Sequence, residues 1–100
     1  MIPTTLEQRL YEGDRAREVL ENEAFIAAFD ATEKEVIEQW TNSPARDVEG
    51  REKLWQYLMI LRKVKANLTQ TLETGKLAQI EAKHRQTLRE KATGWLSSVA

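Results

Sequence analysis

The 100-residue chain contains no cysteine, one histidine, two prolines and four glycines. Without cysteine it can form no disulfide, thiolate nucleophile or Cys–His pair. The glycines are scattered, so there is no glycine-rich phosphate loop, and a GxSxG nucleophile elbow is also missing. We therefore expect a protein that is not an enzyme, and we predict no catalytic residue, cofactor or metal ion.

Long apolar runs are also missing. No segment approaches the roughly 20 apolar residues that a membrane span needs, and the N-terminal MIPTTLEQRL lacks a signal-peptide core. We therefore expect a soluble protein that is not secreted and has no membrane partner. The few glycines and prolines favour an all-α fold. One hundred residues make a single domain, 1–100, whose modest core often needs help from a partner or an oligomer.

The net charge of −1 hides a strong polarity along the chain. Residues 1–49 hold twelve acids and five bases, a net charge of −7, whereas residues 50–100 hold ten bases and four acids, a net charge of +6. Opposite charges attract, so the halves pair either within one chain or head to tail between chains. A basic C-terminal surface for an acidic partner is a third reading.

The longest helical pattern covers residues 47–74, where apolar residues repeat at heptad spacing from Leu54 onward. The face is broad enough for a bundle, and further large apolar residues lie off it, so we expect contacts on a second side. Gly75 is predicted to end this helix as its C′ residue. The face comprises Leu54, Tyr57, Leu58, Leu61, Val64, Leu68 and Leu72, and off it lie Trp55, Met59 and Ile60.

A second amphipathic helix is predicted over 23–41, with Phe25, Phe29, Val36 and Trp40 on one face. The Thr41-Asn42-Ser43-Pro44 sequence is typical of a turn. Either Ser43, followed by Pro44 at N1, or Asp47 caps the next helix. Because the connection is short, we expect helices 23–41 and 47–74 to form an antiparallel hairpin within a small helical bundle.

The ends of the chain are patterned less strongly. Leu6 and Leu10 indicate a turn or two of helix, and Gly13-Asp14 predicts a break with Asp14 as N-cap of a helix from Arg15. That helix either stops at a second cap, Asn22, or runs on with a bend. Residues 76–96 predict a basic amphipathic helix, interrupted at Gly94, that either folds back or projects. Its apolar face comprises Leu77, Ile80, His84, Leu88, Trp95 and Val99.

Three features of the sequence bear on binding. Glu81-x-x-His84 has the spacing of di-iron bundle ligands, but it would need a dimer, so a core or interface histidine is favoured. The basic runs at 62–65 and 83–91 can touch phosphates, but no helix-turn-helix accompanies them, so a solvated or protein-facing surface is favoured. Tryptophans often anchor interfaces. The candidate interaction residues are Trp40, Trp55, Trp95, Arg62, Lys63, Lys65, Lys83, His84, Arg85 and Arg89.

Four short motifs lie within residues 21–78: NEAF at the start, W-x-x-[ST]-P at Trp40–Pro44, REKLW at Arg51–Trp55 and ETGKLA at Glu73–Ala78. In these, the chain resembles short helical proteins encoded among the head and morphogenesis genes of tailed bacteriophages. The resemblance implies a virion structural or assembly component in the host cytoplasm or the virion. We expect a homo-oligomer whose partners are itself or other phage structural proteins. The alternatives are a nucleic-acid-binding packaging protein, using the basic C-terminal half, and a host-directed inhibitor or adaptor.

Overall fold

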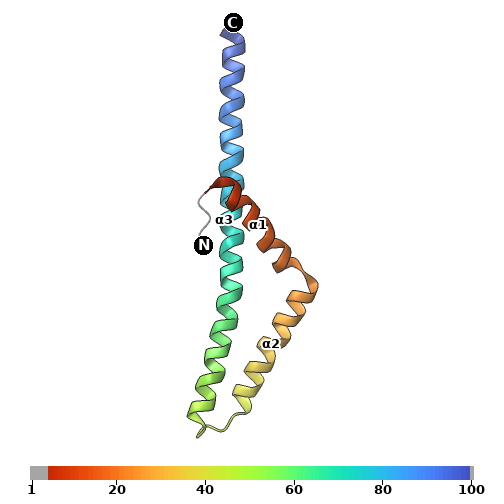
Figure 1. The fold of residues 1–100 in the computed structure, drawn as a ribbon, viewed down its shortest axis with the longest axis vertical. Coiled ribbons are helices and arrows are strands. Elements are labelled where there is room, and N and C mark those ends of the chain that lie inside the picture. Colours follow the sequence, from red (N-terminus) through yellow and green to blue (C-terminus); the bar gives the residue numbers. More distant parts are fainter. Residues whose placement is uncertain (1–4, 100) are drawn as a thin grey trace.

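The computed structural model describes residues 5–99, with side chains described as far as residue 97, and this part of the chain contains three α-helices and no strand (Figure 1). They are α1 (Leu6–Glu21), α2 (Glu23–Asn42) and α3 (Val48–Val99). The predicted all-α class is confirmed. The molecule measures 82 × 24 × 17 Å with a radius of gyration of 22.1 Å. A compact 100-residue protein has a radius of gyration near 13 Å, so the chain is a rod with α1 and α2 lying along one side of it.

The rod is α3, a single helix of 52 residues and roughly 78 Å. The prediction that a helix ends at Gly75 was wrong, and so was the predicted interruption at Gly94. A C′ glycine takes a left-handed backbone, but no described glycine has a positive φ. Of the two alternatives for the C-terminal segment, the structure shows projection: it continues the direction of α3 beyond α1 and α2 (Figure 1).

Gly13 and Gly75 lie in the interior of α1 and α3, at the point where the two helices cross and their backbones come close. A Cβ atom added to Gly75 would lie 2.6 Å from the Cα of Gly13, closer than real side chains approach. Ala16 and Ala78, one turn further along each helix, are buried beside the glycines. The predicted break at Gly13-Asp14 was therefore wrong, since this glycine allows two backbones to approach rather than ending a helix.

The true start of α1 is a capping box that our sequence reasoning missed. The Thr5 Oγ1 atom accepts a hydrogen bond from the Gln8 backbone N–H at 3.1 Å, and the Thr5 N–H donates to Gln8 Oε1 at 3.3 Å. A Thr followed three residues later by Gln is a known sequence signal for such a box. At the other end, Asn22 caps α2, which confirms one of the two open alternatives.

The chain turns after α2 as predicted, but the connection spans residues 43–47, because Thr41 and Asn42 still belong to α2; α2 runs antiparallel to the first half of α3 (Figure 1). Asp47 is the N-cap side chain of α3, because its Oδ1 atom accepts from the Gly50 N–H at 3.1 Å. The rival prediction, with Ser43 as N-cap and Pro44 at N1, was wrong. Ser43 is instead the C-cap residue of α2.

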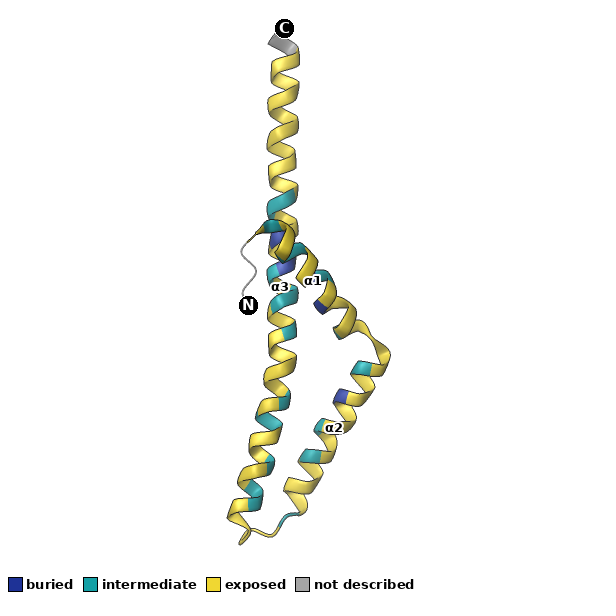
Figure 2. Ribbon diagram, viewed as in Figure 1, coloured by how far each residue is buried: buried dark blue, intermediate teal, exposed yellow. Residues whose placement is uncertain are grey.

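The core is very small. Among the described residues, the buried apolar side chains are Ala16, Phe29 and Ala78, and Figure 2 shows the buried positions clustered near the α1–α3 crossing, apart from Phe29 on α2. Two predicted face positions of α3, Tyr57 and Val64, are exposed. The prediction that these two residues face another helix was wrong, because α2 covers a strip of α3 that lies a fraction of a turn around the helix from them. The strip comprises Leu54, Leu58, Leu61 and Leu68, all half-buried.

Candidate interaction surfaces

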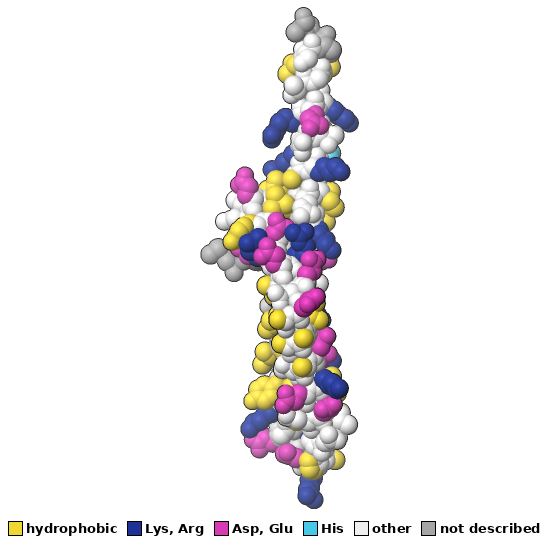
Figure 3. Space-filling view, turned by 90° about the vertical axis from the view of Figure 1, so that its right-hand side faces the viewer, with side chains coloured by type: hydrophobic (Ala, Val, Ile, Leu, Met, Phe, Trp, Pro, Cys, Tyr) yellow, Lys and Arg dark blue, Asp and Glu magenta, His cyan; other side chains and the backbone are white. Residues whose placement is uncertain are grey.

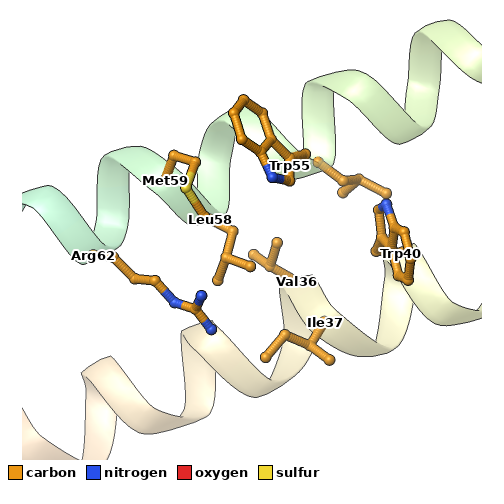
Figure 4. A pocket seen from close by; sticks show the side chains of 8 residues that line it. Val36, Ile37, Trp40, Trp55, Leu58, Met59 and Arg62 are labelled. Atoms are coloured by element: carbon orange, nitrogen blue, oxygen red, sulfur yellow. The ribbon is translucent and has the colours of Figure 1, made fainter.

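An apolar groove lies between α2 and α3 near the turn that joins them, with a cavity of about 270 Å³ that is partly open to solvent. In Figure 4, Val36 and Leu58 point toward each other from the two helices, and Trp55 and Met59 extend along one side. Arg62 is its one charged lining residue. The groove is lined by Val36, Ile37, Trp40, Leu54, Trp55, Leu58, Met59 and Arg62.

Arg51 holds the turn end of this groove together. Its Nη1 atom donates to the Trp40 carbonyl oxygen at 3.2 Å, to the Ser43 carbonyl oxygen at 3.0 Å and to Ser43 Oγ at 2.9 Å. The guanidinium carbon also lies 4.2 Å from the centre of the Trp40 ring. Our sequence reasoning missed Arg51, because its partners Trp40 and Ser43 lie across the turn.

The predicted basic run at 62–65 is divided between contacts within the chain and solvent. Arg62 Nε lies 3.8 Å from a carboxylate oxygen of Glu33, and Lys65 Nζ lies 4.9 Å from the centre of the Phe29 ring. Lys63 is exposed. Arg62 and Lys65 therefore help to hold α2 against α3, whereas Lys63 faces solvent.

The second surface is the C-terminal arm, residues 83–97 of α3. Every side chain in the arm is exposed, and basic side chains are spread along it (Figure 3). It holds five of the predicted interaction residues, and with Lys91 and Glu90 its net charge is +3 when His84 is neutral. The predicted residues are Lys83, His84, Arg85, Arg89 and Trp95.

His84 is exposed, so of the two alternatives the core histidine was wrong and the interface histidine stays a prediction. Its predicted partner, Glu81, binds two arginines: Arg9 Nη2 lies 3.0 Å from Oε2, and Arg85 Nη2 lies 2.7 Å from Oε1. In the described part of the chain, no group of three or more His, Asp or Glu side chains is placed to hold a metal ion. The Glu81 side chain thus joins α3 to α1 through Arg9, and His84 faces solvent.

The three tryptophans fall into two places. Trp40 and Trp55 both line the groove, with 42% and 55% of their area exposed, and Trp95 lies on the arm with 65% exposed. The structure therefore gathers Trp40, Trp55 and Arg62 in one site. It places Trp95 with the basic residues of the arm, on the opposite half of α3.

The charge polarity of the sequence is largely uncompensated within one chain. Of the seven ion pairs between described residues, one, Glu33–Arg62, joins an acid of the first half to a base of the second. The Arg9–Glu81 pair joins a base of the first half to an acid of the second. The other five pairs join residues three or four positions apart in one helix. Among the described residues, Asp30, Glu35 and Glu38 of α2 form no ion pair, and neither do Lys83, Arg89 and Lys91 of the arm, so these charges remain available to another molecule.

No helix in the described residues combines the length and apolar character needed to cross a membrane. Comparisons with protein-family models, curated proteins and solved structures found no match to this chain. The resemblance to phage morphogenesis proteins therefore stays a prediction.

Proposed function

We propose that this chain is a non-enzymatic helical protein–protein interaction module that self-associates. The observation that carries the proposal is its accessible surface of 8120 Å². A compact monomer of 11.6 kDa exposes about 5800 Å². The excess of about 2300 Å² per chain lies in the range that obligate oligomers bury.

The quality of the exposed surface supports the same conclusion. Fifteen large apolar side chains of the described residues are exposed, against three buried apolar residues. Exposed apolar area of this extent is typical of interaction surfaces, because soluble monomers rarely expose large apolar patches. The groove and the arm carry six of these residues: Ile37, Trp40, Trp55, Leu88, Trp95 and Leu96.

A structural or assembly role in a bacteriophage particle is the biological setting that we propose. It rests on the resemblance of residues 21–78, and a rod that joins copies of itself or other structural proteins suits such a role. The place of action would be the host cytoplasm or the virion. No catalytic step and no cofactor is needed for this function.

Solution mass tests the proposal. Light scattering behind size exclusion, repeated at several protein concentrations and at low and high salt, should give a defined oligomer. Its dissociation at high salt would indicate that charges pair between chains, because salt screens exposed charges. A mass of 11.6 kDa at every concentration and salt would contradict self-association.

Nucleic-acid binding is a second candidate, favoured by the exposed basic side chains of the arm. The arm has four cations, so the slope of log K against log salt could be no steeper than about −3.6 from the arm alone. A duplex-binding titration at several salt concentrations would measure that slope. A salt slope that stays unchanged after the loss of Lys83 and Lys91 would argue against the arm as the nucleic-acid contact.

A further inference from the structure

The continuity of α3 joins the groove and the arm on one line. At about 100° per residue, six exposed or half-exposed apolar residues stay within an arc of about 80° along the helix. We call this line the α3 stripe. It consists of Trp55, Met59, Leu77, Ile80, Leu88 and Trp95.

The α3 stripe is free of α1. The α1 helix packs on Gly75 and Ala78, which lie about 180° and about 120° around α3 from the centre of the stripe. The two ends of the stripe are matched, because Trp55 and Trp95 each lie 20 residues from Gly75. A helix packed along the stripe would reach Trp55 and Met59 and thereby enter the α2–α3 groove.

We infer that the α3 stripe binds a second copy of this chain, with the two α3 helices antiparallel about a two-fold axis near Gly75. This inference rests on the proposed self-association. An antiparallel pair places the arm of each chain in the groove of the other, so Trp95 meets the partner's Trp55. Both contacts are equivalent by symmetry, as in an isologous dimer.

Charge selects the antiparallel arrangement over the parallel one. The α2 helix, beside the groove, holds five acids and one base, a net charge of −4, and the arm has a net charge of +3. A parallel pair would set arm against arm and α2 against α2, which places like charges together. An antiparallel pair sets the arm beside α2 at both ends, where opposite charges attract.

Particular side chains can be assigned to this attraction. On α2, Asp30 and Glu33 share the side of the helix that carries Ile37 into the groove. On the arm, Lys91 lies within the arc of the stripe and Lys83 lies about 60° outside it, both toward the side that would face the partner's α2. Within the described chain Asp30, Lys83 and Lys91 form no ion pair, and Glu33 pairs with Arg62 at the groove.

Charge reversal with complementation tests the inference. Two variants, D30K/E33K and K83E/K91E, are measured by sedimentation at low salt, alone and as an equimolar mixture. Each alone should self-associate at least tenfold more weakly than wild type, because both contacts become repulsive. The mixture should recover association, and so should the chain carrying all four changes. Circular dichroism of each variant confirms that the helices remain formed.

The outcomes separate the two proposals. A wild-type chain that is monomeric at every concentration overturns the proposed function and this inference together. A wild-type oligomer that charge reversal leaves unchanged, or that the mixture fails to recover, overturns the inference alone. Recovery in the mixture and in the fourfold variant supports the antiparallel pair.

Cross-linking checks the direction of the helices independently. The natural chain has no cysteine, so single cysteines can be placed freely. With a short bis-maleimide, Lys91→Cys should cross-link to Met59→Cys on another chain and not to itself. Leu77→Cys, close to the proposed axis, should cross-link to itself and serves as the control. Efficient self-linking of Lys91→Cys would indicate parallel helices and overturn the inference.

Discussion

Adding one methyl group at the α1–α3 crossing is expected to destabilise the fold, even though the same change normally favours a helix. In Gly75→Ala the new Cβ would lie 2.6 Å from the Gly13 Cα and 3.2 Å from the Arg9 carbonyl oxygen. Ordinary contacts begin near 3.4 Å, so the helices must separate by about 0.8 Å. Because both close atoms belong to backbone, no side-chain rotation can relieve the contact.

The magnitude follows from two opposing effects. Replacing glycine by alanine inside a helix contributes up to about 1 kcal/mol. Overpacking a tight contact costs about 1–3 kcal/mol, because the layer around Ala16 and Ala78 must open. We expect a net loss of about 1 kcal/mol in the free energy of unfolding for Gly75→Ala.

Gly94→Ala is the matched control, because it lies in the same helix with nothing within 4 Å of its added Cβ. It should keep the helix gain without the crossing cost, so the two variants should differ by about 1–3 kcal/mol. Urea unfolding followed by circular dichroism, at one protein concentration for all variants, measures the difference. Equal stabilisation by both substitutions would refute the close approach of α1 and α3.

Two further substitutions test the α2–α3 connection, again by urea unfolding. Arg51→Lys should lower the free energy of unfolding by about 1–2 kcal/mol, because a lysine cannot donate the same set of hydrogen bonds while stacking on Trp40. The control, Arg46→Lys in the exposed turn, should have no effect. Asp47→Ala should cost about 1 kcal/mol through the lost cap to Gly50, and Asp47→Asn should restore most of it. An Asp47→Ala variant as stable as wild type would contradict the capping role.

Local features of this protein could be predicted well from its residues. The α2 helix, the turn after it, and the caps at Asn22 and Asp47 depend on side chains within a few positions of the backbone groups that they bind. The apolar positions of the arm were predicted to share one face for the same reason, since helical spacing alone brings them together. Whether this face binds anything depends on another molecule.

The glycines show where sequence reasoning failed. Gly13 and Gly75 carry the same local signal as a helix end, because glycine is common there. Their role depends on a neighbour more than sixty residues away, which no local pattern reveals. Arg51 is a similar case, since its partners Trp40 and Ser43 lie across the turn.

The sequence by itself determined that the chain is helical and which residues share each helical face, and it offered Asn22 as one of two alternatives for the start of α2. These are short-range properties, because they depend on the side chains within a few positions, on the capping residues and on the 3.6-residue period of the helix. Only the tertiary structure decided that α3 is continuous, that α1 crosses it at two glycines, and that the arm and the groove lie on one line. Those features depend on contacts between residues distant in the sequence, and such contacts override the local preference of glycine to end a helix.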